Sequence, residues 1–431
     1  MTSTISRRSL LQAGALGLAA IAVGPNARVL GALGSLGTSA SFASETTLSL
    51  TMRECLMEMV DTSRVYMWSF DSPQAGLRVP GPVIYCTEGD PVAIDVKNEL
   101  SGIHKFAVMR KVDPDDPAGP ADVVVASGPI AAGETVRVSF TAPAAGTYIY
   151  LDPYRAPLHR AMGLAGVLVV LPRGGNTPYT APPPTVQNLF DDLGTTSHFP
   201  GHPWVPARTW IWVFSTVDPV AHDRVWQDPN LAPDAFLAGY NPSYFMINGK
   251  SGFFAAHDPA IAPHGRIGQP ALIRTANVGL ATHSPHIHGN HVYAVAEGGH
   301  LDENIFALDT WRVPPLYTTD VVLPFVRPPD AWPWPPSDPS VFTTDLAGDG
   351  MPGLVYPMHC HMELSQMANG GNYPQGCITH WVIEGDLVEG PPPTTTTSTS
   401  STTTTSTSTT STSSTTTTTT RPRRPPRPPK G

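Results

Sequence analysis

The chain has 431 residues, with 26 lysine and arginine residues against 35 aspartate and glutamate residues. Three of the basic residues lie in the first 43 positions and five in the last eleven, whereas every acidic residue lies between Glu45 and Glu389. The central part therefore carries 18 basic and 35 acidic residues, a net charge near −17. This charge argues against a nucleic-acid partner, because nucleic-acid binding depends on cationic contacts. It is compatible with cationic substrates or metal ions.

Residues 1–43 have the pattern of a twin-arginine signal peptide. Arg7 and Arg8 precede a short apolar run rich in glycine and alanine, and the segment ends at Ser-Phe-Ala, with Ala43 last. We predict export by the twin-arginine route and removal of this segment, which places the protein in a secreted, periplasmic or cell-surface location. The alternative is a transmembrane anchor, although the apolar run is short for that role.

Residues 44–175 and 205–390 both predict β-sandwiches. Runs such as RVPGPVIYCTEGDPVAIDVKNEL and GLAGVLVVLPRG in the first part, and RTWIWVFSTV and GCITHWVIEGDLV in the second, are rich in β-branched and aromatic residues. Glycine and proline turns separate them, as in all-β proteins. Residues 176–204 read as a proline-rich linker, and no long amphipathic helix is expected. The fold class is therefore all-β, with two sandwiches in tandem.

Residues 391–431 predict a disordered stalk. The segment is almost wholly threonine and serine after three prolines, and it ends in the basic sequence RPRRPPRPPKG. With no apolar residue to bury, it cannot offset the entropy of ordering. Threonine and serine with proline are typical of an O-glycosylated stalk. The basic tip is expected either to contact cell-wall polyanions or to be a solvated tail without a partner.

Two short segments concentrate metal ligands. His283, His286 and His288 lie in HSPHIHG, and His359, Cys360 and His361 lie in MHCH about seventy residues later. Thiolate with imidazole favours copper or zinc over magnesium or calcium. On a strand, His359 and His361 would point to one side and Cys360 to the other, so one segment would serve two neighbouring metal sites. This arrangement points to copper redox chemistry. Packing in the hydrophobic core, the alternative explanation, accounts poorly for all six residues together. Nucleophilic catalysis by Cys360 is a further alternative, but histidines on the opposite face would be poorly oriented as bases.

These segments give the chain, from Leu48 to Val388, a resemblance to multicopper oxidases of the laccase-like, two-domain cupredoxin type, which are related to copper nitrite reductases. RVPGPVIYCTEGDPVAIDVKNEL resembles the start of their first domain, whereas SYFMINGKS, HSPHIHGNHVYAV and the HCH segment resemble their last domain in the same order. GTYIYLDPYRAPLHRAMGLAGVLVVLPRGG also resembles the first-domain copper loop of nitrite reductases. The resemblance implies two cupredoxin-like Greek-key sandwiches.

The resemblance also implies roles for individual residues. His283 and Cys360 fall on ligands of the mononuclear type 1 copper, His286 and His104 on type 2 ligands, and His288, His359 and His361 on ligands of the coupled copper pair. Several family ligands are missing, because Phe106, Leu151, Pro153 and Ser365 occupy positions where the family has histidine. We therefore expect fewer than four coppers per chain and a degenerate three-copper cluster. No catalytic residue apart from the metal ligands, and no organic cofactor, is predicted.

The residues that replace the missing ligands stay open at this point. Met367 and Cys377 are candidates for the axial position of the type 1 copper. His159, His291 and His380 are spare imidazoles, and Asp152 stands where nitrite reductases have their first-domain cysteine. His104 and His159 are also compatible with ordinary buried or surface roles. With Cys360 reserved for copper, Cys55 and Cys86 are the pair that export would allow to form a disulfide.

Two functions follow from the resemblance. The first is an oxidase that takes electrons from a phenol, a small aromatic molecule or a metal ion and passes them to dioxygen. The second is a surface protein that binds and sequesters copper with weak turnover or none. Nitrite reduction is a distant third, since the first-domain thiolate is absent. In two-domain relatives the three-copper cluster forms between subunits, so a homo-oligomer, typically a trimer, is expected.

Overall fold

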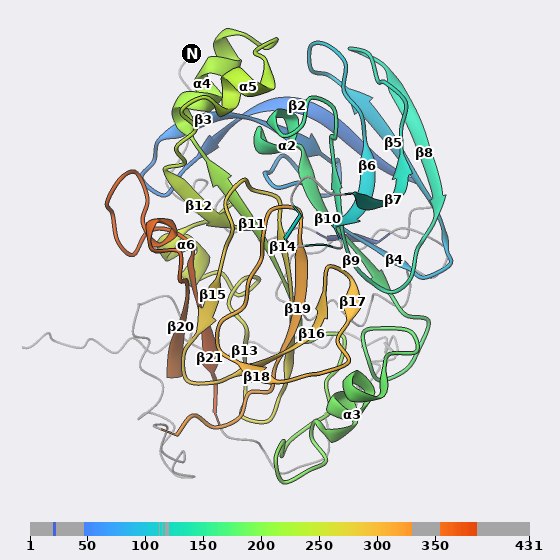
Figure 1. Cartoon of the computed structure of the whole chain (residues 1–431), viewed down its shortest axis with the longest axis vertical. Coiled ribbons are helices and arrows are strands. Elements are labelled where there is room, and N and C mark those ends of the chain that lie inside the picture. The colour runs from blue at the N-terminus through green and yellow to red at the C-terminus, as the bar shows by residue number, and fades with distance from the viewer. Residues whose placement is uncertain are drawn as a thin grey trace, which may run out of the picture. The chain divides into compact units, whose positions relative to one another are not determined.

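The structure is a computed structural model that describes residues 20–22, 47–111, 113, 115–116, 120–329 and 354–385. Most of the predicted signal peptide and the whole predicted stalk from residue 391 lie outside the described residues. Strands make up most of the regular structure and form two pairs of sheets (Figure 1). Each pair is a sandwich, so the predicted all-β fold with two cupredoxin-like sandwiches is confirmed.

The first sandwich packs a six-stranded sheet, in the order β1-β4-β10-β9-β6-β7, against a four-stranded sheet, in the order β3-β2-β5-β8. Neighbouring strands are often far apart in sequence, which is typical of a Greek key. Its strands are β1 (Ala20–Ala22), β2 (Leu48–Glu58), β3 (Arg64–Asp71), β4 (Val83–Thr87), β5 (Pro91–Asn98), β6 (Ala107–Lys111), β7 (Ala121–Ala126), β8 (Thr135–Thr141), β9 (Gly146–Leu151) and β10 (Ala165–Leu171).

The second sandwich packs a seven-stranded sheet against a four-stranded one. The larger sheet runs β12-β11-β14-β19-β16-β17, with β18 paired to β16, and the smaller one runs β13-β21-β20-β15. Its strands are β11 (Thr209–Val217), β12 (Tyr244–Ile247), β13 (His264–Gly265), β14 (Ala271–Asn277), β15 (Pro285–Ile287), β16 (Val292–Glu297), β17 (His300–Leu301), β18 (Ala307–Leu308), β19 (Thr318–Leu323), β20 (Leu354–Cys360) and β21 (Ile378–Ile383).

The helices are short and lie in the connections between strands. They are α2 (Leu158–Ala161), α3 (Pro184–Asp192), α4 (Pro219–Gln227), α5 (Pro233–Leu237), α6 (Gly252–Ala256) and the 3₁₀ turn η3 (Glu363–Gln366). Helix α3 lies in the predicted linker. Helix α4 is capped by Asp218, whose side chain accepts hydrogen bonds from Val220 N and Ala221 N. Within the described residues, no helix combines the length and apolar character needed to cross a bilayer.

The continuous apolar run of β10 results from burial on both faces. Its side chains alternate, so that Leu168 and Val170 join the core of the first sandwich while Val167 and Val169 face the other way. There they pack in a second apolar layer with residues of β11 such as Ile211. A strand that is buried on both faces reads as an unbroken hydrophobic run rather than an alternating one.

The Cys55–Cys86 disulfide that export would allow is not formed, because both cysteines are free buried thiols. Cys55 lies in β2 of the four-stranded sheet and its Sγ donates to Met67 O over 3.5 Å, whereas Cys86 lies in β4 of the opposite sheet. They belong to different apolar clusters. Burial raises the pKa of each thiol to about 12, so neither ionises readily.

Candidate metal centres

Antiparallel pairing of β15 with β20 joins the two ligand-rich segments. His286 lies directly opposite His359, and Pro285 lies opposite Cys360. Along β20, Cys360 is fully buried in the sandwich core, whereas the flanking rings of His359 and His361 stack on each other with centroids 5.3 Å apart. The strand thus places Cys360 on one side and the two histidines on the other, as the alternation of side chains requires.

The buried side of this strand carries a set of sulfur and nitrogen ligands. Cys360 Sγ lies 3.6 Å from His283 Nδ1, and it accepts a hydrogen bond from Ser284 N over 3.2 Å. The Cys377 thiol donates a hydrogen bond to Cys360. His283 is fully buried against the ring of Phe214, and its Nε2 has no hydrogen-bond partner. Two cysteines and one imidazole therefore converge in a buried site.

The surroundings of Cys360 favour its thiolate form. The hydrogen bond from Cys377 is the largest influence, and together with His283 and Ser284 N it outweighs desolvation and lowers the pKa of Cys360 to about 3. Burial, and the charge of its neighbour, raise the pKa of Cys377 well above its usual value. The two shifts are opposite, so the site favours Cys360 as the thiolate and Cys377 as the thiol. Since the thiolate is the form that ligates metals, the site is ready for a soft ion.

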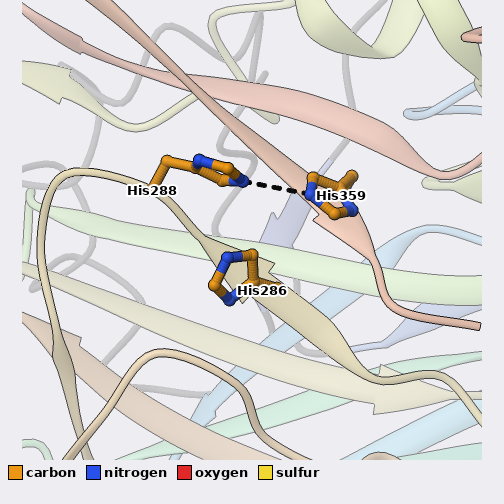
Figure 2. Close-up of side chains that lie close together, drawn as sticks. All are labelled: His286, His288 and His359. Atoms are coloured by element: carbon orange, nitrogen blue, oxygen red, sulfur yellow. Dashed lines mark hydrogen bonds between the residues drawn. The ribbon is translucent and has the colours of Figure 1, made fainter.

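Four imidazoles gather on the other side of the strand. The ring nitrogens of His286, His288 and His359 lie within 4.8 Å of one another. Figure 2 shows His288 and His359 pointing toward each other, with their Nε2 atoms 3.1 Å apart, and His286 beside them. The ring of His361 lies 4.6 Å from that of His286, between centroids. This spacing is short enough for one ion to bond several of these nitrogens.

Neighbouring groups fix the orientation of these rings. Thr310 Oγ1 lies 2.8 Å from His286 Nδ1, which leaves Nε2 as the nitrogen available to a metal ion. His288 is held through its backbone, because its N donates to Pro357 O and its O accepts from Trp381 Nε1 over 2.7 Å. A hydrogen bond to the ring nitrogen that does not bind metal is typical of metal-ligating histidines. Thr310 could not be found from the sequence, because it lies 24 residues from its partner and in no recognisable motif.

Partial burial and the neighbouring imidazoles favour the neutral form of His286 and His359. Desolvation lowers the pKa of His286, and the neighbouring His288 and His361 lower it further against the opposing charge of Asp309. Desolvation also lowers the pKa of His359, with smaller contributions from the surrounding histidines. Neutral imidazole is the metal-binding form, so these rings offer free lone pairs at neutral pH.

His104 does not join this cluster. It is buried in the first sandwich, where its Nδ1 lies 2.7 Å from Asp152 Oδ2, and His159 Nδ1 approaches the same oxygen at 2.7 Å. Burial acts to raise the pKa of Asp152, but the hydrogen bonds to both histidines outweigh it and lower that pKa. Of the spare imidazoles, His159 thus pairs with His104 rather than with the second-sandwich ligands.

Of the other residues considered as replacement copper ligands, one contacts the buried set and the rest do not. Cys377 contacts Cys360, whereas Met367 follows η3 and is only partly buried. Ser365, at the position of the missing type 1 histidine, is buried and donates from Oγ to Met362 O. The ring of His380 lies against that of His257, and His291 is exposed. Among these candidates, Cys377 is therefore the residue placed to complete the buried set.

The donor sets fit copper. Thiolate and imidazole suit copper and zinc, and a cluster of neutral imidazoles suits copper as well. The first sandwich adds no imidazole at the other expected positions, since Phe106 and Leu151 are buried in its apolar clusters. The fit is thus good for a buried mononuclear site and for a histidine cluster, and incomplete for three coppers.

Comparison with known proteins supports a copper-protein fold. Residues 74–175 match the family model described as multicopper oxidase. Among solved structures, the blue copper oxidase from Nitrosomonas europaea is similar, with a TM-score of 0.55, 18% sequence identity, and coverage of 78% of this chain and 86% of that one. The multicopper oxidase mgLAC gives a TM-score of 0.54 and 19% identity, over 82% of this chain and 89% of that one. A search of curated proteins found no match.

At these identities the structural likeness establishes the fold. The chain has the two-sandwich cupredoxin architecture, and its residues 74–175 match the multicopper oxidase family model. The matched segment ends before the second sandwich begins, so the ligand-rich HSPHIHG and MHCH segments lie outside it. Their roles are argued from the geometry described above.

Proposed function

We propose that the protein is an exported copper-binding oxidoreductase that oxidises a phenolic, small aromatic or metal-ion donor with dioxygen as acceptor. One observation carries this proposal. Cys360 lies between His359 and His361 in sequence. Its side chain faces His283 and Cys377, on one side of the strand. The rings of His359 and His361 face His286 and His288, on the other side. Copper bound at these positions supplies one-electron redox chemistry. The chain itself contributes a short covalent connection between a buried thiolate set and an imidazole cluster.

The number of imidazoles limits the expected activity. His286, His288, His359 and His361 gather, whereas the described part of the first sandwich places no histidine beside them. We propose fewer than four coppers per chain and a turnover with dioxygen well below that of a laccase. The alternative is a surface protein that sequesters copper, and the incomplete cluster favours it.

Copper content and the visible spectrum test the proposal. The purified protein, loaded with copper and freed of excess ion, should show an intense visible band, because a copper–thiolate bond gives strong charge-transfer absorption. Cys360→Ser should abolish the band. His288→Gln should lower the copper content and keep the band, since His288 lies on the other side of the strand. His300→Gln, an exposed histidine in β17, is the matched control and should change neither.

Oxygen consumption with a phenolic donor separates the two functions. Slow uptake that disappears in both Cys360→Ser and His288→Gln supports the oxidase. Stable copper binding with no uptake for phenols or reduced metal ions supports sequestration. Rapid uptake at four coppers per chain would contradict the incomplete cluster, and copper content unchanged in a variant lacking both His359 and His361 would contradict the site.

The cellular setting is part of the proposal. The twin-arginine pattern at Arg7 and Arg8 supports export, and the basic tip supports contact with cell-wall polyanions. The resemblance supports a homo-oligomer, with a trimer expected. Light scattering on the purified protein measures the assembly, and fractionation of the producing cells shows whether the protein leaves the cytoplasm.

A further inference from the structure

Three buried ligand-type side chains converge inside the first sandwich, apart from the sites proposed above. His104 precedes β6 and bridges to Ile130, Asp152 directly follows β9, and His159 lies in α2. Their exposed fractions are 1%, 0% and 2%. They offer two imidazole nitrogens and a carboxylate oxygen, all within 4.8 Å of one another. Charged or polar groups are seldom buried this deeply unless they are paired or coordinate a metal.

The Asp152 carboxylate is fixed so that one oxygen faces both rings. Its Oδ1 accepts hydrogen bonds from Lys105 N over 3.1 Å and from Tyr154 N over 2.8 Å. Its Oδ2 lies 2.7 Å from the Nδ1 atoms of both His104 and His159. The backbone thus positions one half of the carboxylate, and the other half meets two nitrogens at one point.

In one tautomer of His104, a lone pair would face Asp152 in place of the hydrogen bond described above. Its Nε2 lies 3.3 Å from Ser101 O, a carbonyl that can only accept a hydrogen bond. A neutral imidazole has one N–H. If Nε2 donates that proton to Ser101, the Nδ1 lone pair faces the Asp152 carboxylate, which is repulsive unless a cation lies between them. An imidazole that donates to a carbonyl through one nitrogen while the other binds metal is a common arrangement.

The walls of the cluster are aromatic and apolar. The two imidazole rings stack with centroids 4.4 Å apart, and the edge of Trp68 contacts both at 5.4 and 5.2 Å. The ring of Tyr154 lies 5.7 Å from that of His159. These walls exclude bulk solvent and hold the rings in place, so that little reorganisation is needed to bind an ion.

We propose that His104, Asp152 and His159 form a separate binding site for one divalent ion of the zinc or copper(II) type. Two imidazoles and a carboxylate suit these ions. Tetrahedral coordination by ligand atoms about 2.05 Å from the ion separates them by about 3.3 Å, so the 2.7 Å contacts would open by roughly half an ångström. Zinc has no redox chemistry, so zinc bound here would stabilise the first sandwich and would not transfer electrons.

Zinc content tests the site. The full-length protein is stripped with a chelator, supplied with zinc, separated from free ion and analysed for bound metal. Asp152→Asn is nearly isosteric, and its amide can still accept from Lys105 N and Tyr154 N and donate to the imidazoles. We expect this variant to hold one zinc fewer per chain than the parent, with unchanged circular dichroism. His159→Gln should lose the same equivalent, whereas the exposed His300→Gln should lose none.

A variant that gains a visible absorption band tests the same geometry, without relying on a loss of bound zinc. In a Cys360→Ser background, Asp152→Cys would place a thiolate beside the two imidazoles. Copper(II) should then give an intense visible band that Cys360→Ser alone lacks, and adding His159→Gln should reduce it severalfold. Equal zinc content in Asp152→Asn and the parent would show a buried hydrogen-bond network only and overturn the proposal. Absence of the new band in a folded Asp152→Cys variant would likewise overturn it.

Discussion

Asp320 is a buried charge that connects the two sandwiches, and replacing it should destabilise the protein strongly. Its Oδ2 lies 2.7 Å from Arg274 Nη1 and accepts from Tyr179 Oη over 2.8 Å. Its Oδ1 accepts from Thr147 Oγ1 of β9 over 2.9 Å. Arg274 and Asp320 are each almost fully buried, and they lie opposite each other on β14 and β19. One carboxylate thus joins the first sandwich, the linker and the second sandwich.

The expected cost follows from this burial. Removing one partner of a buried ion pair leaves the other charge without compensation and costs about 3–5 kcal/mol. Asp320→Asn keeps the shape of the side chain but cannot neutralise Arg274, so a loss in this range is expected. With about 2.1 cal/mol/K of unfolding entropy per residue and roughly 350 folded residues, this loss corresponds to a fall in Tm of about 4–7 °C.

Denaturant unfolding of four proteins checks the reasoning: the parent, Asp320→Asn, Arg274→Met and the double variant. The double variant should lose at least about 2 kcal/mol less than the sum of the single losses, because it leaves no isolated charge. Asp95→Asn is the matched control, since it removes a carboxylate from the solvent-exposed Arg137–Asp95 pair and should cost under about 1 kcal/mol. Additive single losses, or a cost for Asp320→Asn no larger than the control, would refute the account.

Two further predictions concern a buried histidine and a glycine. Desolvation lowers the pKa of His222 to about 4 from 6.5, so the unfolded chain binds its proton first and stability should fall by about 3 kcal/mol as the pH drops from 6.5 to 4. His222→Asn, which can still donate to Tyr66 O, should show a flatter stability profile in that window; identical profiles would contradict the prediction. Gly289 has φ +77°, and an added Cβ would lie 2.5 Å from the ring of Tyr356. Gly289→Ala should therefore cost about 1–3 kcal/mol and reduce copper binding at the adjacent His288, measured by thermal unfolding and metal analysis; a variant with parental Tm and copper content would show that the turn adapts.

The sequence predicted the sandwiches because β-branched residues and turn residues repeat at strand spacing. It also placed His359 and Cys360 on opposite sides of one strand, because a period of two requires only that the segment be extended. The short helices such as α3 were not expected. A helix of nine residues in a connection carries little periodic signal, and it is stabilised by tertiary packing of residues such as Phe190.

The sequence could not predict which residues, far apart along the chain, lie together in the fold. Cys377 was one of two open axial candidates, and only the packing of the loop after η3 brings it to Cys360. His104 and Asp152 lie 48 residues apart, and their pairing depends on how β6 and β9 align. Whether Cys55 and Cys86 are bridged stayed open, because compartment and elimination say nothing of which sheet each cysteine occupies.

Strand β1 has a consequence for maturation. Ala20–Ala22 lie within the predicted signal peptide, and they pair in parallel with Val83–Tyr85 of β4, with Ile21 fully buried. Removal of residues 1–43 would leave β4 as an outer strand with unpaired backbone groups and an apolar gap where Ile21 packs. Exposed strand edges of this kind bind other extended chains. Cleavage would thus leave an unpaired strand edge on the first sandwich, with which a strand from a neighbouring copy or another protein would be able to pair.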